Sequence, residues 1–364
     1  MQATLITAPR TTTRAMLDPT RLCHLRCEFC YYRPTDAFHT VKPWEAQAKE
    51  VSDAKARGCD AADLTGGDPL TNPHVVELVK LCVEQGISLR IISSLICAER
   101  VLDDVLDAGV DDWLISMHGA KAETHNDIVK VPHAREKQIR RMAKIAARMR
   151  YCCNYVMVAK NQTEMAAFSH WLIGRDHEPP KIVNFICFNP FGDWLQSAEM
   201  RKAAYDQILD LRIAGPILYE AIDVLESAGI GVNVRYYPMC GLAERHRKNV
   251  CNDRQVAFDL GEWDNAFGAR TPVDVVLRTY SIPLSYRNEE QGEPCCDCNL
   301  HGCCGGANRI WHALAKEKFG TSPLVPITLP EGPVGFWHYR GQNVMGLDPR
   351  AISQAPATLQ PDGR

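Results

Sequence analysis

Short apolar segments alternate with longer amphipathic segments along most of the chain. The apolar segments have the length and composition of buried strands, which we expect at residues 13–17, 61–65, 89–94, 112–117, 151–159, 181–188 and 230–236. We expect helices between them at 43–57, 75–85, 100–108, 134–149, 163–172 and 198–228, the last one broken near Gly215–Pro216. Strands that alternate with helices indicate βα units and a parallel sheet, which places the chain in the α/β class.

Several polar or glycine-containing segments directly follow these expected strands. In βα folds the functional loops gather at the carboxyl ends of the strands. The segments expected at this edge are the cysteine-containing loop after the first strand, Gly66–Gly67, Ser93–Ser94, Ser116–His118 and Asn189–Gly192. We therefore expect one site that is built from several strand ends.

Composition and charge restrict where the protein acts. The net charge of −3 over 364 residues gives no sign of an extended nucleic-acid or membrane surface. The sequence shows neither a signal peptide nor an apolar run of about 18 residues, so we expect a cytoplasmic protein. In that reducing compartment, clustered cysteines among the sixteen indicate metal or redox chemistry rather than disulfides.

Three cysteines, Cys23, Cys27 and Cys30, lie just behind the first expected strand at the spacing C-x3-C-x2-C. Three thiolates leave one iron of a [4Fe–4S] cluster without a protein ligand. An open iron is useful only if another molecule binds it. The alternatives are a zinc site or three buried thiols, but zinc normally takes four ligands in pairs such as C-x2-C.

At these residues the sequence resembles the radical S-adenosylmethionine (radical SAM) superfamily, whose signature is this triplet with an aromatic residue before the third cysteine, here Phe29. Tyr31 and Tyr32 follow, as is common there. The resemblance implies that the amino and carboxylate groups of S-adenosylmethionine bind the open iron. It also implies that the reduced cluster cleaves this cofactor to a 5′-deoxyadenosyl radical. The fold that it implies is an open partial (β/α)6 TIM-like barrel, which suits six units, too few for a closed eightfold barrel.

The segment Thr65-Gly66-Gly67-Asp68-Pro69 matches the glycine-rich motif of the same family at the end of the second strand. There, backbone groups exposed by the glycines bind the amino group of the methionine moiety. The usual form has Glu where this chain has Asp68, which keeps the carboxylate but shortens it. Taken alone, these residues would be only a turn.

Other strand-end residues are candidates by position. Ser93, Ser94 and Ser116 are candidates to contact the ribose or the methionine carboxylate, although serines at strand ends also serve as caps and turns. His118 is a candidate acid or base toward the substrate. Asn154, Asn189 and Phe191 are candidates to line the adenosine pocket.

A second group of cysteines lies near the C-terminus, in the segment 295–305, with Cys240 upstream. These residues resemble the auxiliary-cluster domains of SPASM and twitch type, and the cysteines that fit that pattern best are Cys240, Cys295, Cys298 and Cys303. The resemblance implies one auxiliary [4Fe–4S] cluster, with a four-cysteine zinc knot as the alternative. The adjacent Cys296 and Cys304 leave the choice of ligand open in each pair, and Cys251 has no assigned role.

The expected organisation is a flexible lead-in at 1–12, a barrel at 13–236, an auxiliary-cluster domain at 237–312 and a wrapping tail at 313–364. We see no N-terminal extension large enough for a cobalamin domain or a peptide-leader-binding domain. The C-terminal part lacks the interleaved basic and aromatic residues of an RNA-binding module, so transfer RNA is not an expected substrate.

The function that these features predict is a radical SAM enzyme that abstracts hydrogen from a small-molecule substrate. The outcome would be oxidation, epimerisation, carbon–carbon bond formation or rearrangement, with the auxiliary cluster as electron acceptor or substrate anchor. A reductase such as flavodoxin or ferredoxin is the expected partner. One alternative is a radical SAM maturase of a ribosomally made peptide, and another is a non-catalytic zinc or iron–sulfur protein.

Overall fold

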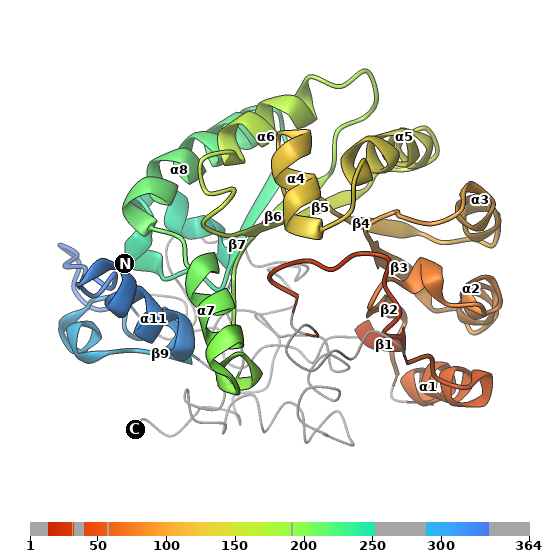
Figure 1. Ribbon diagram of the computed structural model, residues 1–364, viewed down its shortest axis with the longest axis horizontal. Coiled ribbons are helices and arrows are strands. Elements are labelled where there is room, and N and C mark those ends of the chain that lie inside the picture. The colour runs from red at the N-terminus through yellow and green to blue at the C-terminus, as the bar shows by residue number, and fades with distance from the viewer. Residues whose placement is uncertain are drawn as a thin grey trace.

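A single curved parallel sheet organises the protein (Figure 1). The computed structural model describes residues 14–30, 32, 40–56, 58–190, 192–251 and 289–334. The sheet follows chain order: β1 (Arg14–Thr20), β2 (Ala61–Gly66), β3 (Ser88–Ser93), β4 (Asp112–Ser116), β5 (Cys152–Met157), β6 (Ile182–Cys187), β7 (Gly231–Arg235) and β8 (Val250–Cys251). Every neighbouring pair is parallel, and β1 and β8 are the two edges of an open sheet. The predicted α/β partial barrel is confirmed.

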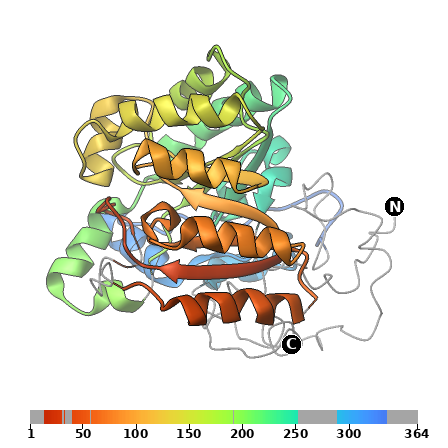
Figure 2. The same cartoon turned by 90° about the vertical axis from the view of Figure 1, so that its right-hand side faces the viewer.

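Helices cover the convex side of this sheet. They are α1 (Trp44–Ala56), α2 (Val75–Glu84), α3 (Glu99–Asp107), α5 (Ala134–Ala146), α6 (Met165–Ile173) and α8 (Leu211–Ser227). Two further helices, α4 (Ala122–Val129) and α7 (Ala198–Gln207), lie apart from this outer layer (Figure 1). Figure 1 shows α1, α2, α3 and α5 in a row along the outer side, and Figure 2 shows α1 running alongside β1. In the described part of the chain, no helix is long and apolar enough to cross a membrane.

Two features of the helices differ from expectation. The break in the segment 198–228 lies at 208–210 rather than near Gly215–Pro216. Asp210 causes it, because its side chain accepts a hydrogen bond from the Arg212 N–H (2.9 Å) and so caps the start of α8, which then continues through Pro216. The short helix α4 was not predicted, and it lies directly beside the cysteine loop described below.

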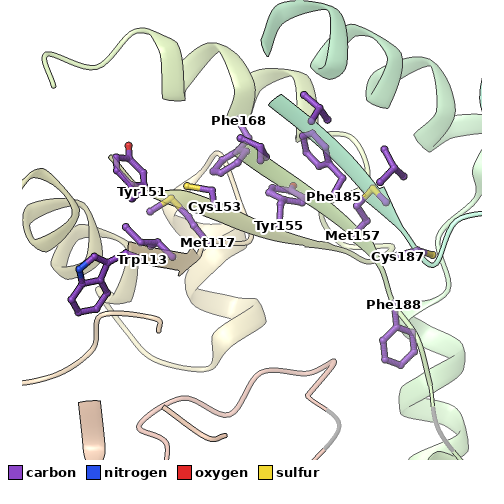
Figure 3. Close-up of a cluster of buried hydrophobic side chains, with 14 of the residues drawn as sticks. Trp113, Met117, Tyr151, Cys153, Tyr155, Met157, Phe168, Phe185, Cys187 and Phe188 are labelled. Atoms are coloured by element: carbon purple, nitrogen blue, oxygen red, sulfur yellow. The ribbon is translucent and has the colours of Figure 1, made fainter. Parts of the chain in front are cut away.

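The two faces of the sheet have different chemistry. Along β5, Cys153, Tyr155 and Met157 face the covering helices, where Tyr155 packs 4.9 Å from Phe168 of α6 (Figure 3). Because successive strand side chains alternate, Asn154 points to the concave face. At the amino ends of the strands an ion network closes this face: Arg90 lies 3.6 Å from Asp63 and 3.0 Å from Asp112, and Lys181 lies 2.7 Å from Asp112. The open part of the concave face is therefore at the carboxyl ends of the strands.

The C-terminal segment packs against the end of the barrel. It contains β9 (Glu289–Glu290), β10 (Ala307–Asn308) and α11 (Arg309–Phe319), and β9 and β10 pair antiparallel. Lys318 of α11 donates hydrogen bonds to the Tyr205 and Ile208 carbonyls (2.9 Å each). The division into domains stays a prediction. Strand β8 pairs with β7, so residues 250–251 lie in the barrel sheet although they fall within the expected auxiliary-cluster domain at 237–312.

Candidate cofactor and cluster sites

The loop that carries Cys23, Cys27 and Cys30 begins where β1 ends, and it is held by backbone hydrogen bonds to α4. The Arg26 N–H donates to the Val129 carbonyl and the Glu28 N–H donates to the Ile128 carbonyl, each at 3.0 Å. The Glu28 carboxylate also pairs with Lys130 and with Lys160 (2.5 and 2.8 Å). These contacts fix the loop on the helix that follows β4, so its shape does not depend on a bound group alone.

The three thiols of this loop lie close enough to influence one another. Burial raises the pKa of Cys23 to about 12, with Asp68 and Cys30 adding to the shift. Burial also raises the pKa of Cys27 well above its usual value, and the neighbouring Cys30 and Cys23 thiols raise it further. The Leu25 N–H points at the Cys23 sulfur (3.4 Å), as suits a thiolate ligand. These residues fit a cluster, whose positive irons would offset the cost of gathering buried thiolates.

Gly66 and Gly67 let the chain entering the cysteine loop pass directly over the end of β2. A Cβ at Gly66 would lie 2.1 Å from the Thr20 oxygen, and one at Gly67 would lie 2.2 Å from the Leu22 oxygen. Gly66 also has φ +117°, which favours glycine. The N–H groups of Gly67 and Asp68 donate to the Thr20 and Leu22 carbonyls (2.8 and 2.7 Å). These two hydrogen bonds join the start of the cysteine loop to the end of β2.

The Asp68 carboxylate is bound on all sides by the protein. It is 2% exposed, its Oδ1 accepts from the Ser93 hydroxyl (2.8 Å) and the Leu70 N–H (3.1 Å), and its Oδ2 accepts from the Ser94 hydroxyl (2.5 Å) and the Ser94 N–H (3.0 Å). Asp68 and Ser94 thus bind each other across the ends of β2 and β3. Thr65, the half-buried residue before the glycines, lies at the same strand end.

His118 follows β4 and lies against the cysteine loop, with its ring edge-on to Phe29 at 4.7 Å between centroids. Its Nδ1 accepts a hydrogen bond from the Val156 N–H (3.1 Å), so the ring proton is on Nε2. Burial, with a smaller effect of His125, lowers the pKa of His118 well below its usual value. His118 is thus a neutral imidazole that donates through Nε2, rather than an imidazolium acid.

Asparagine side chains form a ladder on the concave face, a feature that the sequence analysis missed beyond Asn154. Asn154, Asn184 and Asn233 are in register on β5, β6 and β7. Asn233 donates to Asn184 (3.0 Å), and Asn184 donates to the Asn154 oxygen (2.8 Å). This orientation leaves the Asn154 amide N–H₂ as the donor end of the ladder, beside the half-buried Ser116 in register on β4. The available signal was that each asparagine is the third residue of its strand.

Asn189 lies after β6, where it binds the C-terminal segment. Its side-chain oxygen accepts a hydrogen bond from Asn308 (2.5 Å), which also donates to the Pro190 carbonyl (3.0 Å). Asn189 therefore links the barrel to the residue that caps α11. Phe191, its predicted neighbour in the adenosine pocket, is outside the described residues.

The C-terminal cysteines form a second group around a cavity. Four cysteines, Cys240, Cys295, Cys298 and Cys304, line it. Burial raises the pKa of Cys295 to about 11, and the nearby Cys304 and Cys298 thiols raise it further. N–H groups point at two of the sulfurs, from Ile327 to Cys298 (3.3 Å) and from Gly306 to Cys304 (3.4 Å). These four side chains fit the ligand set of one cluster.

Two predicted or alternative ligands of this group lie elsewhere. Cys303 is fully buried, 3.9 Å from the Met239 sulfur and 3.6 Å from the Leu300 carbonyl, and does not line the cavity. Cys296 is exposed. The Cys251 side chain is outside the described residues. Among the side chains that the structure describes, no three His, Cys, Asp or Glu are arranged to hold a single metal ion.

Residues 17–168 match the model of the radical SAM superfamily, whose members use a [4Fe–4S] cluster and S-adenosylmethionine. Over 133 residues the chain is 27% identical to a PqqA peptide cyclase of Methylorubrum populi, covering 36% of this chain and 34% of the cyclase. Over 226 residues it is 25% identical to a GTP 3′,8-cyclase of Limosilactobacillus fermentum, covering 59% and 64% of the two chains.

The first curated relatives are thus matched over only about a third of their length. SuiB of Streptococcus suis has a similar fold, with a TM-score of 0.50 at 13% identity over 63% of this chain and 50% of SuiB. The C-terminal cysteine group fits a SPASM-like module.

Proposed function

The chain carries a radical SAM domain at residues 17–168, and from this premise we propose that it is an enzyme that cleaves S-adenosylmethionine and abstracts hydrogen from a substrate. The observation that carries the proposal is the junction of the cysteine loop with the end of β2. There, Gly66 and Gly67 let the chain leading to Cys23 sit directly on the strand end where the cofactor is expected. A non-catalytic zinc protein would have no use for this close approach.

The roles that we propose follow from the geometry of the strand ends. Cys23, Cys27 and Cys30 would hold a [4Fe–4S] cluster, and backbone groups at Gly66–Gly67 would bind the cofactor ammonium. When bound, cluster and cofactor together supply a 5′-deoxyadenosyl radical by one-electron cleavage of the sulfonium. The other contacts that we propose are Phe29 and Thr65 as walls of the pocket, and Ser116, His118 and Asn154 as hydrogen-bond donors. Asn189 acts by joining the barrel to α11.

For the C-terminal group we propose an auxiliary [4Fe–4S] cluster held by Cys240, Cys295, Cys298 and Cys304. This set differs from the sequence-based one in its last member, because Cys304 lines the cavity and Cys303 does not. Four protein thiolates leave no iron open for a substrate. A cluster held by these residues would serve as an electron acceptor, and an external flavodoxin or ferredoxin would supply the electron for cofactor cleavage.

A small molecule is the substrate class that we propose, with a peptide as the second candidate. The GTP 3′,8-cyclase is matched over 59% of this chain, which supports the small molecule. The PqqA peptide cyclase supports the peptide, but the match covers only 36% of this chain.

Product analysis of anaerobically reconstituted protein tests the proposal. With dithionite and S-adenosylmethionine we expect 5′-deoxyadenosine and methionine to form slowly even without substrate. Detection is by liquid chromatography and mass spectrometry, with unreduced protein as the control. If methylthioadenosine or S-adenosylhomocysteine were the only product, radical formation at the 5′ carbon would be excluded.

A further inference from the structure

The Asp68 carboxylate is a fixed negative charge in the cofactor site. Backbone N–H groups from Leu70 and Ser94 occupy one position on each of its oxygens, and the Ser93 and Ser94 hydroxyls occupy the others. It is 2% exposed, and in the described part of the chain no lysine or arginine forms an ion pair with it. Hydrogen bonds from neutral groups hold such a charge without cancelling it.

This charge is attached to the segment that carries the first cluster cysteine. The Asp68 N–H donates to the Leu22 carbonyl (2.7 Å), and Leu22 precedes Cys23. The Thr71 hydroxyl reinforces the connection, since it lies within hydrogen-bond distance of the carbonyls of both Leu22 (2.9 Å) and Asp68 (2.7 Å) and can donate to either.

We propose that Asp68 lowers the reduction potential of the cluster bound by Cys23, Cys27 and Cys30, and that its carboxylate does not itself bind the cofactor. The inference rests on the proposed function. Adding an electron to a cluster is less favourable beside a buried, uncompensated negative charge, because the interior screens poorly. A lower potential makes the reduced cluster a stronger donor to the sulfonium. Both carboxylate oxygens accept their hydrogen bonds from the protein, so Asp68 acts through its charge rather than by touching the cofactor.

The test is a potentiometric titration of the reconstituted full chain, followed by electron paramagnetic resonance without S-adenosylmethionine. We expect Asp68→Asn to make reduction at least tenfold more favourable, an upward shift of about 59 mV for one electron. We expect Asp68→Glu, which keeps the charge, to stay closer to the wild-type potential. An Asp68→Asn protein with an unchanged potential would overturn the inference.

The variant Ser94→Ala distinguishes an effect of the Asp68 charge from a structural role of Asp68. It removes one hydrogen bond to the carboxylate but keeps the charge, so we expect a smaller downward shift, opposite to that of Asp68→Asn. A purely structural role would move both variants in the same direction. If Asp68→Asn failed to fold, an unchanged or raised potential in Ser94→Ala would still overturn the inference.

Glu164→Gln is the matched control, because Glu164 is another buried carboxylate held by backbone N–H groups, at Ala120 and Lys121 (2.9 and 3.1 Å), and these partners and Thr124 lie at the start of α4 rather than in the cysteine loop. We expect its potential to equal that of wild type. Failure of the proposed function looks different: the wild-type protein would then bind no open-site cluster or form no 5′-deoxyadenosine. A wild-type protein that does both, with equal potentials in all variants, would refute only the role of Asp68.

Discussion

The two cysteine groups are built in opposite ways. The first takes its three cysteines from eight consecutive residues, 23–30, in a loop anchored on α4. The second brings Cys240, after β7, together with Cys295, Cys298 and Cys304, more than fifty residues further along the chain. A group made from one short loop can keep its ligands together when distant parts of the chain move. A group made from two segments depends on how those segments pack, and in turn holds them together.

The number of ligands follows the same division. Three thiols in the first group fit a cluster with one open iron, and the adjoining Gly66–Gly67 turn lets the chain leading to Cys23 lie directly on the end of β2. Four thiols in the second group line a cavity and would supply all the protein ligands of a fully ligated cluster. This difference supports the proposed division, with bond cleavage at the first group and electron transfer at the second.

The largest expected effect comes from removing the first group. We expect Cys23/Cys27/Cys30→Ala to abolish formation of 5′-deoxyadenosine and to lower the iron content from about eight to about four per chain. The reason is that each group holds its own cluster. Iron analysis and product chromatography measure both quantities. A triple variant that kept all its iron would show that these cysteines are not ligands. A wild-type protein that bound only about four irons plus zinc would show that the second group holds zinc rather than an auxiliary cluster.

Removing a ligand of the second group sharpens the division of labour. We expect Cys298→Ala to keep substrate-free cofactor cleavage within about tenfold of wild type, or about 1.4 kcal/mol in barrier. Turnover of the true substrate should be lost, because the substrate radical has no electron acceptor. Since loss of a metal ligand can also unfold a small module, circular dichroism is measured on the same sample. A folded Cys298→Ala protein with normal substrate turnover would reduce this group to a scaffold.

The adjacent Cys303 and Cys304 offer a matched pair. We expect Cys304→Ala to lose the iron of the second cluster, because its sulfur faces the cavity. We expect Cys303→Ala to keep it and to lose only about 1 kcal/mol of stability, since that thiol packs in the core against Met239. Iron content and thermal unfolding under anaerobic conditions distinguish the two. The reverse result would make Cys303 the fourth ligand.

The sequence predicted the parallel sheet and the first cysteine group well, because both are local signals. Strand and helix periods repeat over short windows, and Cys23, Cys27 and Cys30 lie within one loop. The sequence could not decide whether Cys303 or Cys304 is the fourth ligand. Adjacent cysteines have the same chemistry, and only the backbone conformation determines which side chain faces the cavity. The role of Asp68 was similarly hidden, because its hydrogen-bond partners lie on another strand.

The last prediction concerns the asparagine ladder. The ladder could not be predicted from sequence alone, because it depends on the register of three strands. Asn184 accepts from Asn233 and donates to Asn154, so it fixes which end of the Asn154 amide faces the concave side. An aspartate at 184 cannot donate, and Asn154 would turn its N–H₂ toward the new carboxylate, presenting its oxygen instead. We therefore expect Asn184→Asp to weaken binding of S-adenosylmethionine about tenfold in an anaerobic calorimetric titration, equivalent to about 1.4 kcal/mol. Ile186→Val, two residues further on the same face of β6, is the control and should bind normally. Unchanged cofactor binding in a folded Asn184→Asp protein would mean that the open amide of Asn154 faces the substrate rather than the cofactor.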